Sequence, residues 1–282
     1  LFEQAFSMSR ARYFLDAKEE AAPGDEALKA YEDGLERRSG RVPLQHILGT
    51  QEFLGMEFFV NAHVLIPRQD TETLVETVLN EQKNRNISVL DMCTGSGCIA
   101  VSLKALGGYA RVAAADISPE ALEVAEKNAG TYPVEFRQSD MFAAFEPGRD
   151  MFDVIVSNPP YFINSLKCPD NKRSVARHTD SLSLSELIDD SCSLLSLSGR
   201  IALVLPYEQL GEIEMIARKN HLSICRQTDV IPVPGAQPKR LLIELSVPPT
   251  DIKNRNTLII EEARHQYTPE YIALTKDFYL KM

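Results

Sequence analysis

The sequence predicts an α/β fold built around a Rossmann-like parallel sheet. After Asn86, short apolar segments alternate with segments of helical periodicity, which is the pattern of a parallel sheet with right-handed crossovers. A glycine-rich turn over residues 95–97 follows the first of these strands and opens a helix. The 282 residues suffice for one large α/β domain and a small accessory domain.

The segment before this sheet has a different character. Residues 1 to about 40 are predicted to be helical, because Ala, Leu, Glu and Lys dominate, with an interruption at residues 23–25. Residues 41–66 favour a short β-hairpin linker with a turn near Gly55, and helical periodicity resumes over Thr71–Lys83. Since the chain begins with Leu1 rather than Met, we expect the helical segment to be truncated.

The elements of the sheet region follow in order. Strands are predicted at Ser88–Leu90, Arg111–Ala115, Val134–Gln138, Phe152–Val156, Arg200–Leu205, Ser223–Thr228 and Arg240–Val247. Helices are predicted at Ile99–Leu106, Pro119–Ala129, Leu184–Leu195 and Gln209–Asn220, with Ser118 as the cap of the second. Ligands of such sheets bind beyond the carboxyl ends of the strands, where the distinctive residues of this chain fall.

Composition excludes several classes of function. A net charge of -10 argues against a generally basic surface for nucleic acid, although it leaves room for a local basic groove. No apolar run is long enough to span a membrane, and no signal peptide is evident. The five cysteines include no C-x-x-C pair, so we expect neither a metal site nor a disulfide framework, and we expect a cytoplasmic location.

Three strand ends carry a candidate cofactor site. Residues 95–100 fit G-x-G-x-x-G/A, a weak signal by itself, in which glycines allow close backbone approach and a helix N-terminus favours an anion. Asp116 ends the second strand and can accept hydrogen bonds from ribose hydroxyls. Asp140 follows the third strand and can accept one from an adenine amine. A nicotinamide cofactor would fit the glycine loop equally well, but the rest of the chain offers no hydride chemistry.

The fourth strand ends at the candidate catalytic residues Asn158, Pro159, Pro160 and Tyr161. The nitrogen of an amide or aryl amine is a poor nucleophile, because its lone pair is delocalised. The side-chain oxygen of Asn158 and the carbonyl of Pro159 can both accept hydrogen bonds from such an NH2 group and aim it at a methyl donor. Proline stiffens the turn, and Tyr161 offers a flat face to a planar group.

With these motifs in place, residues 1 to about 163 resemble the peptide chain release factor N(5)-glutamine methyltransferase family. The resemblance rests on residues 41–49, 52–53, 64–76, 95–100, 115–118 and 139–142. It implies a seven-stranded class I methyltransferase sheet, with residues 1–45 as a helical substrate-recognition domain, 46–70 as a hairpin linker and 71–282 as the methyltransferase domain. The family usually has Pro-Glu in place of Gln69-Asp70, and often Trp in place of Met141.

The same resemblance implies S-adenosyl-L-methionine as cofactor and the glutamine of the release factor Gly-Gly-Gln loop as methyl acceptor. Residues 158–161 would hold that glutamine side chain. Together with the strand-end argument, it predicts a cofactor-binding set of Cys93, Thr94, Gly95, Ser96, Gly97, Asp116, Asp140, Met141 and Asn158.

After Tyr161 the resemblance changes to the valine-tRNA adenine N(6)-methyltransferase family. It rests on residues 164–170, 176–183, 228–232, 234–235, 238–240 and the tail 264–279. That family normally lacks the N-terminal helical domain. We therefore hypothesise a fusion at residues 154–162, natural or produced by sequence assembly, at the motif both families share.

Three hypotheses for function follow. The helical domain and hairpin favour protein-glutamine methylation, with release factors as partners, and this is the preferred prediction. Basic residues after the catalytic turn could meet tRNA phosphates and favour tRNA adenine methylation; they are Lys167, Lys172, Arg173, Arg177 and His178. A third hypothesis is an inactive relic that keeps its affinity for the cofactor. The chemistry of the turn cannot separate the first two, because a carboxamide and an adenine amine present the same two N–H donors.

Overall fold

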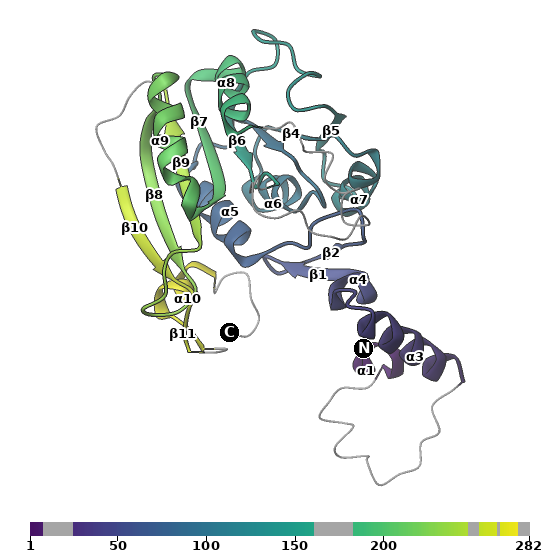
Figure 1. Cartoon of the computed structure of the whole chain (residues 1–282). Coiled ribbons are helices and arrows are strands. Elements are labelled where there is room, and N and C mark those ends of the chain that lie inside the picture. Colours follow the sequence, from purple (N-terminus) through teal and green to yellow (C-terminus); the bar gives the residue numbers. More distant parts are fainter. Residues whose placement is uncertain (8–24, 161–182, 248–253, 264–265, 276–282) are drawn as a thin grey trace.

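The computed structural model describes residues 1–7, 25–160, 183–247, 254–263 and 266–275. Its centre is an eight-stranded sheet in the order β10-β8-β9-β7-β6-β3-β4-β5 (Figure 1). The strands are β3 (Ser88–Met92), β4 (Arg111–Asp116), β5 (Glu135–Gln138), β6 (Phe152–Ser157), β7 (Leu195–Pro206), β8 (Ser223–Ile231), β9 (Arg240–Ser246) and β10 (Asn254–Ile259). The predicted α/β fold with a Rossmann-like sheet is therefore confirmed.

The strand order reverses in the middle of the sheet. From β3 the chain moves outward through β4 to β5, and then returns to place β6 on the other side of β3. All four strands run parallel, with Met92 of β3 opposite Ser157 of β6. Crevices for ligands form at such reversals, beyond the carboxyl ends of the strands. In this chain the glycine loop and Asn158 both follow the strands at that reversal.

Helices cover both faces of the sheet. The helices α5 (Gln69–Glu81), α6 (Cys98–Gly107) and α7 (Pro119–Ala129) lie on one face, and α8 (Leu184–Leu194) and α9 (Leu210–Lys219) lie on the other. Successive side chains of a strand point to opposite faces. Accordingly, Val154 and Val156 of β6 belong to the core under α5 and α6, whereas Ile155 belongs to the core under α8 and α9.

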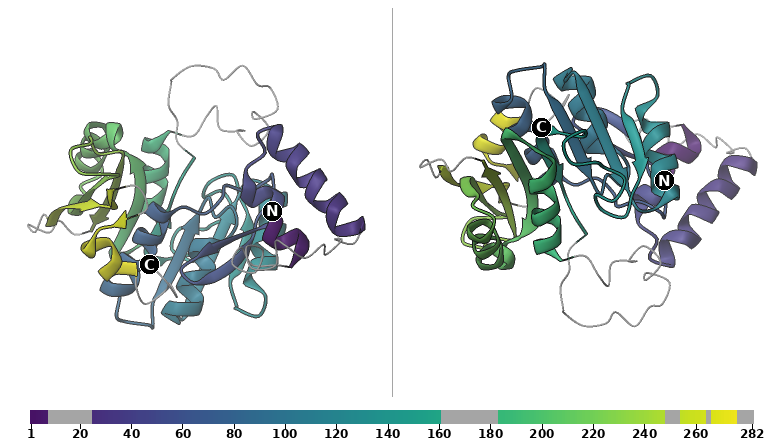
Figure 2. Two further views of the ribbon diagram at one scale, coloured as in Figure 1. Left: turned by 90° about the horizontal axis from the view of Figure 1, so that it is seen from below. Right: turned by 90° about the horizontal axis from the view of Figure 1, so that it is seen from above.

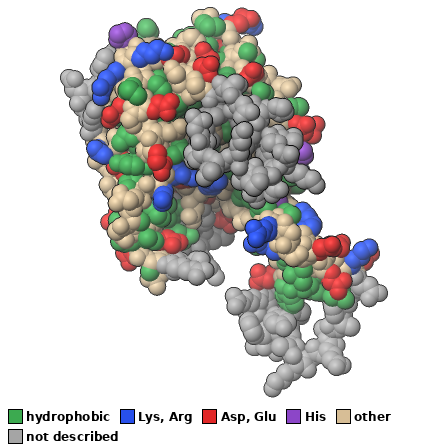
Figure 3. Space-filling model, viewed as in Figure 1, with side chains coloured by type: hydrophobic (Ala, Val, Ile, Leu, Met, Phe, Trp, Pro, Cys, Tyr) green, Lys and Arg blue, Asp and Glu red, His purple; other side chains and the backbone are tan. Residues whose placement is uncertain are grey.

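The helical N-terminal part projects from this body. It consists of α1 (Phe2–Phe6), α3 (Asp25–Ser39) and α4 (Leu44–Leu48). Figure 2 shows it at the opposite end of the molecule from the C-terminal strands. Acidic and basic side chains are interspersed over the face drawn in Figure 3. Within the described ranges, no helix is long and apolar enough to cross a membrane.

A hairpin of β1 (Thr50–Phe53) and β2 (Met56–Phe59) joins the two parts and confirms the predicted turn, with Gly55 at φ 71°. The hairpin is fastened to the sheet-containing body by buried rings and a hydrogen bond. Phe53 and Phe58 are fully buried against each other, edge to face, with ring centroids 5.8 Å apart. The backbone N–H of Leu54 donates to the carboxylate of Glu72 in α5, at 3.0 Å.

Three predictions of secondary structure need correction. Over the described residues the sheet has eight strands rather than seven, because β10 pairs in parallel with β8. The first four residues of β10 are polar and exposed, so no apolar pattern predicts this strand. β9 runs antiparallel to both neighbours, so the sheet is not wholly parallel. Residues 64–66, expected in the hairpin region, are not in a strand. The short elements β11 (Glu261–Ala263), β12 (Gln266–Tyr267) and α10 (Pro269–Thr275) were also not predicted.

Candidate functional site

The glycine loop leaves β3 through three left-handed residues. Cys93, Gly95 and Gly97 have φ values of 62°, 55° and 78°, a region that favours glycine. A Cβ on Gly97 would lie 2.9 Å from the Cβ of Ala125, so this glycine lets the start of α6 pack against α7. A Cβ on Gly95 would meet nothing within 4 Å. The loop is therefore tightly packed at Gly97 and open at Gly95, where a ligand can approach the backbone.

The Asp91 carboxylate holds this loop in place through two hydrogen bonds, a role that sequence reasoning missed. One carboxylate oxygen accepts hydrogen bonds from the Thr94 hydroxyl at 2.5 Å and from the Ala100 N–H at 3.1 Å. The other oxygen is buried and has no hydrogen-bond partner among the described residues. Burial raises the pKa of Asp91 to about 7, against the opposing effect of these two bonds. Its position four residues before Gly95, at the end of a buried strand, was the available signal.

Asp116 lies at the end of β4 beside the open face of the loop. Its two oxygens accept hydrogen bonds from the Gly95 N–H at 2.8 Å and the Ser118 N–H at 3.0 Å. Burial raises the pKa of Asp116, and these backbone hydrogen bonds oppose the rise. A carboxylate has about four acceptor positions, so the capacity for hydroxyl donors remains. Open space at Gly95 beside this acid fits a nucleoside bound against the loop.

Asp140 and Met141 begin the segment that follows β5. Asp140 is exposed, and Met141 has a left-handed backbone with φ 48°. The Ser139 N–H donates to the carbonyl of Asp116 at 2.9 Å, so this segment starts next to the acid of β4.

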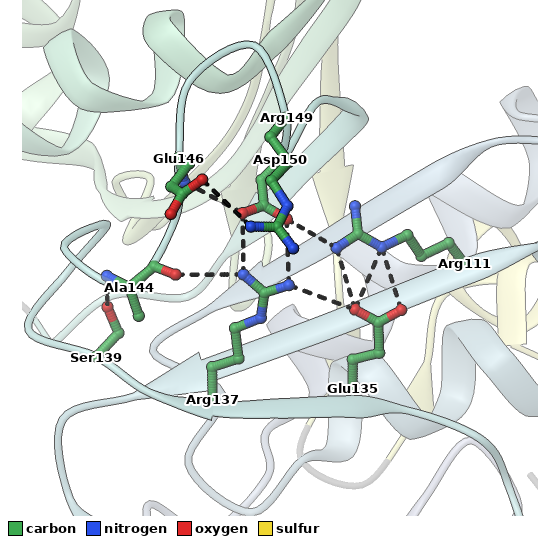
Figure 4. A network of polar contacts seen from close by, with 8 residues as sticks. All are labelled: Arg111, Glu135, Arg137, Ser139, Ala144, Glu146, Arg149 and Asp150. Atoms are coloured by element: carbon green, nitrogen blue, oxygen red, sulfur yellow. Dashed lines mark hydrogen bonds and ion pairs between the residues drawn. The ribbon is translucent and has the colours of Figure 1, made fainter.

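A polar network fixes the segment after β5 (Figure 4). The guanidinium of Arg137 binds both oxygens of Asp150, at 3.0 and 3.1 Å, and Arg111 reaches the same carboxylate at 3.0 Å. Arg137 also donates to the carbonyl of Ala144 at 3.2 Å. The hydrogen bond from Arg137 lowers the pKa of Asp150 far below its usual value, although burial opposes the effect. These contacts restrain the segment that carries Asp140 and Met141.

The candidate catalytic turn, which begins at Asn158, follows β6. The side-chain NH2 of Asn158 donates to the hydroxyl of Thr71 at 2.7 Å. Asn158 is half-buried, Pro159 is buried and Pro160 is exposed. Tyr161 lies outside the described residues, as do the five basic residues of the following segment named above.

The topology brings the predicted site residues to one edge of the sheet. The parallel strands β6, β3, β4 and β5 are consecutive neighbours, so Asn158, the glycine loop, Asp116 and Asp140 follow adjacent strand ends. Within the described part of the chain, no group of three His, Cys, Asp or Glu side chains could hold a metal ion. The edge therefore brings two acids, a glycine loop and an amide to neighbouring strand ends.

Comparison with known protein families decides what kind of molecule this is. The family model described as "Methyltransferase small domain" matches residues 68–225. The chain belongs to this methyltransferase family. Residues 1–49 match a second model, the PrmC N-terminal domain. The whole chain is therefore an S-adenosyl-L-methionine-dependent methyltransferase, and S-adenosyl-L-methionine supplies it with an electrophilic methyl group.

Two curated relatives represent the two resemblances drawn from the sequence, which are thereby confirmed. The tRNA1(Val) (adenine(37)-N6)-methyltransferase of Parabacteroides distasonis is 46% identical over 198 residues, which cover 69% of this chain and 83% of the relative. The release factor glutamine methyltransferase of Koribacter versatilis is 47% identical over 161 residues, covering 55% of this chain and 56% of the relative. The two matched spans together exceed the chain length, so they overlap.

A solved structure shares the fold of this methyltransferase. It is the 16S rRNA N2 G1207 methyltransferase of T. thermophilus in complex with AdoMet and guanosine. The TM-score is 0.50 and the identity 17%, with 70% of this chain and 49% of that chain covered. At this identity the likeness supports the class I methyltransferase fold.

Proposed function

We propose that this methyltransferase transfers a methyl group to the N6 amino group of an adenine in tRNA. The observation that carries the proposal is the 46% identity to the tRNA1(Val) enzyme, because that match extends over 83% of the relative. The match to the release factor enzyme covers 56% of its relative. This comparison favours tRNA over the release factor that sequence reasoning preferred.

In this proposal the cofactor lies along the edge formed by the ends of β3, β4 and β5. The predicted binding set is Cys93, Thr94, Gly95, Ser96, Gly97, Asp116, Asp140, Met141 and Asn158. The open face at Gly95 supports it, as does the acceptor capacity of the Asp116 carboxylate next to that face. The restrained start of the segment after β5 keeps Asp140 and Met141 near Asp116.

The acceptor nitrogen is oriented by Asn158 and Pro159. An adenine amine is planar and carries two N–H donors, which the Asn158 carbonyl oxygen and the Pro159 backbone carbonyl can accept. Two acceptors fix the nitrogen in position. By polarising its N–H bonds they also raise the electron density on the nitrogen as the new N–C bond forms. The proton leaves after transfer, so the turn needs no side chain with a tuned pKa. Tyr161, which completes the motif, keeps its proposed role as a stacking face.

The test is a direct comparison of acceptors. The full chain is incubated with labelled S-adenosyl-L-methionine and either tRNA from a strain lacking the adenine modification or unmethylated release factor. Label in tRNA as N6-methyladenine, absent from release factor, is the expected result. Label only in release factor would overturn the proposal. Asn158→Ala is expected to abolish transfer, while the other eight residues of the predicted binding set keep most of the cofactor affinity.

Methylation of release factor glutamine is the second candidate. The match of residues 1–49 to the PrmC N-terminal domain favours it. The hairpin adds support, because Leu54 and Phe59 bind residues of α5 and α7, so the helical part is attached to the catalytic domain. Under this candidate, residues 1–45 are the recognition domain, residues 46–70 the linker and residues 71–282 the methyltransferase domain. A relic that binds the cofactor without turnover would label neither acceptor.

The fusion hypothesis has its own experiment. Overlap between the two relatives' matched spans supports a join within a region common to both families. Sequencing one uninterrupted DNA molecule across codons 120–200 tests it. Two separate full-length genes at this locus would exclude a natural fusion.

A further inference from the structure

The side chain of Asn158 is held by a residue that lies far away in the sequence. Its amide nitrogen is 2.7 Å from the hydroxyl oxygen of Thr71, 87 residues earlier in the chain. Thr71 is in the first turn of α5 and is 2% exposed. The Thr71 N–H is itself bonded to the carbonyl of Arg68, so the backbone that carries the hydroxyl is fixed.

This contact determines the orientation of the Asn158 carboxamide, that is, which side its oxygen and its nitrogen face. The oxygen and nitrogen of a carboxamide sit on opposite sides of one carbon, so an NH2 facing Thr71 turns the carbonyl oxygen away from α5. A hydroxyl can donate once and accept twice. Because Thr71 donates its proton toward Asp70, over 3.4 Å, it presents lone pairs to Asn158 and accepts from the NH2.

Asp70 is in turn held by Arg240. The Nε of Arg240 lies 3.0 Å from a carboxylate oxygen of Asp70, and the Asp70 side chain is 10% exposed. The sheet explains how this arginine comes to be there. β9 runs antiparallel to β7, with Arg240 opposite Pro206, so β9 begins at the edge where β6 and β7 end. A cation from the start of β9 thereby reaches the start of α5 beside the catalytic turn.

We propose that Thr71 is a positioning residue for Asn158, and that Asp70 and Arg240 hold Thr71 in the orientation that accepts a hydrogen bond. The chain of contacts runs from Arg240 to Asp70, Thr71 and Asn158, and it presents the Asn158 oxygen rather than its nitrogen to the acceptor amine. This inference rests on the proposed role of Asn158. It gives a role to Asp70 and Thr71, which lie in the segment 64–76 on which the family resemblance rests.

Thr71→Val tests the inference, because valine keeps the shape of threonine and removes the hydroxyl. Without its acceptor, the Asn158 amide can rotate, and a misplaced group near the reacting atoms can cost about 10²-fold in rate. We expect kcat on the acceptor that is labelled to fall by about that factor, with the Kd for S-adenosyl-L-methionine within about twofold of the parent. Thr71→Ser, which restores the hydroxyl, is expected to recover most of the rate.

The matched control is Thr77→Val, about two turns along α5 from Thr71, which removes a hydroxyl that donates to the Thr73 carbonyl within the same helix. Its kcat should equal that of the parent. Thermal unfolding of each variant shows whether the fold is intact. Equal kcat for Thr71→Val and Thr77→Val, in folded proteins, would overturn the inference.

Asn158→Ala separates failure of the inference from failure of the proposed site. If Asn158→Ala abolishes transfer while Thr71→Val does not slow it, the site stands and the positioning role of Thr71 is wrong. If Asn158→Ala keeps normal turnover, the site itself is wrong. Any trace of transfer that Asn158→Ala retains should not fall further when Thr71→Val is added, because the hydroxyl then has no amide to orient. If Thr71→Val lowers the rate by the same factor in Asn158→Ala as in the parent, the proposed coupling is wrong.

Discussion

The side-chain nitrogen of Asn128 lies 2.9 Å from the carbonyl oxygen of Ser96, in the glycine loop. The same nitrogen donates to the carbonyl of Phe59 at 2.9 Å, and the Asn128 oxygen accepts from the Phe59 N–H at 2.7 Å. One side chain of α7 therefore connects the hairpin linker with the loop proposed to bind the cofactor. Lys127, its neighbour, lies over the Phe59 ring.

Replacing Asn128 with alanine should weaken both the fold and cofactor binding. Three backbone groups lose a partner, and an unsatisfied, partly buried polar group costs about 1–3 kcal/mol. We expect the free energy of unfolding to fall by about 2 kcal/mol and the Kd for S-adenosyl-L-methionine to rise, measured by urea denaturation and calorimetry. Glu123→Ala, an exposed change on the same helix, is the control and should alter neither. An unchanged Kd would show that the Ser96 contact does not support the cofactor site.

The two glycines of the loop should respond differently to alanine. Gly97→Ala places a Cβ against Ala125 at a left-handed φ of 78°, so overpacking adds to the backbone cost. We expect it to destabilise the fold by about 2–4 kcal/mol. Gly95→Ala has space for its Cβ, and should cost only about 1–2 kcal/mol of stability while it obstructs the open face. Thermal unfolding and titration with cofactor separate the two effects; equal loss of stability would contradict the packing argument.

The Asp150 network should stabilise the protein in a pH-dependent way. Because the pKa of Asp150 is lowered in the folded state, its contribution is fully present above the unfolded value of about 3.9. It is lost as the pH falls through the folded pKa. Asp150→Asn should therefore be less stable than the parent at pH 7, with a difference that narrows below about pH 4. Urea denaturation from pH 3 to pH 7 measures this, and Glu123→Gln is an exposed control.

The contribution of Asp91 to stability should change with pH in the opposite direction. Its pKa is raised to about 7, so the folded state binds a proton that the unfolded state releases near pH 4. The stability of the parent relative to Asp91→Asn should therefore fall as the pH rises from about 4 to about 7, and level off above. Denaturation curves of both proteins at matched pH test this. A constant difference across that range would mean that the carboxyl is ionised throughout.

Much of the fold could be predicted because its signals are local. The prediction for α7 was correct in its bounds, since Ser118 caps the helix and Pro119 stands at its first position. The starts of β4, β6, β8 and β9 were also correct, because apolar runs mark buried strands. By contrast β10, an exposed edge strand with polar residues, carries no such mark. The antiparallel direction of β9 could not be predicted either, since strand direction depends on the path of the connection.

The candidate site, too, could be predicted only in part from the sequence. Its acids and glycines were recognisable because each directly follows a strand. Asp91, Thr71 and Asn128 were missed as site residues, because they act on the site through hydrogen bonds to other residues. A buried acid or a helix threonine has no pattern that distinguishes it from one that only packs.

By itself, the sequence determined the α/β class, the order of most elements, the methyltransferase chemistry and the presence of two family signatures in one chain. These follow from periodicity and short motifs, which depend on neighbouring residues. Only the tertiary structure decided that Thr71 faces Asn158 and that Arg240 faces Asp70, across 87 and 170 residues of chain. The reversal of strand order beside β3 and the antiparallel start of β9 bring those side chains to one edge, and no local pattern encodes such a meeting.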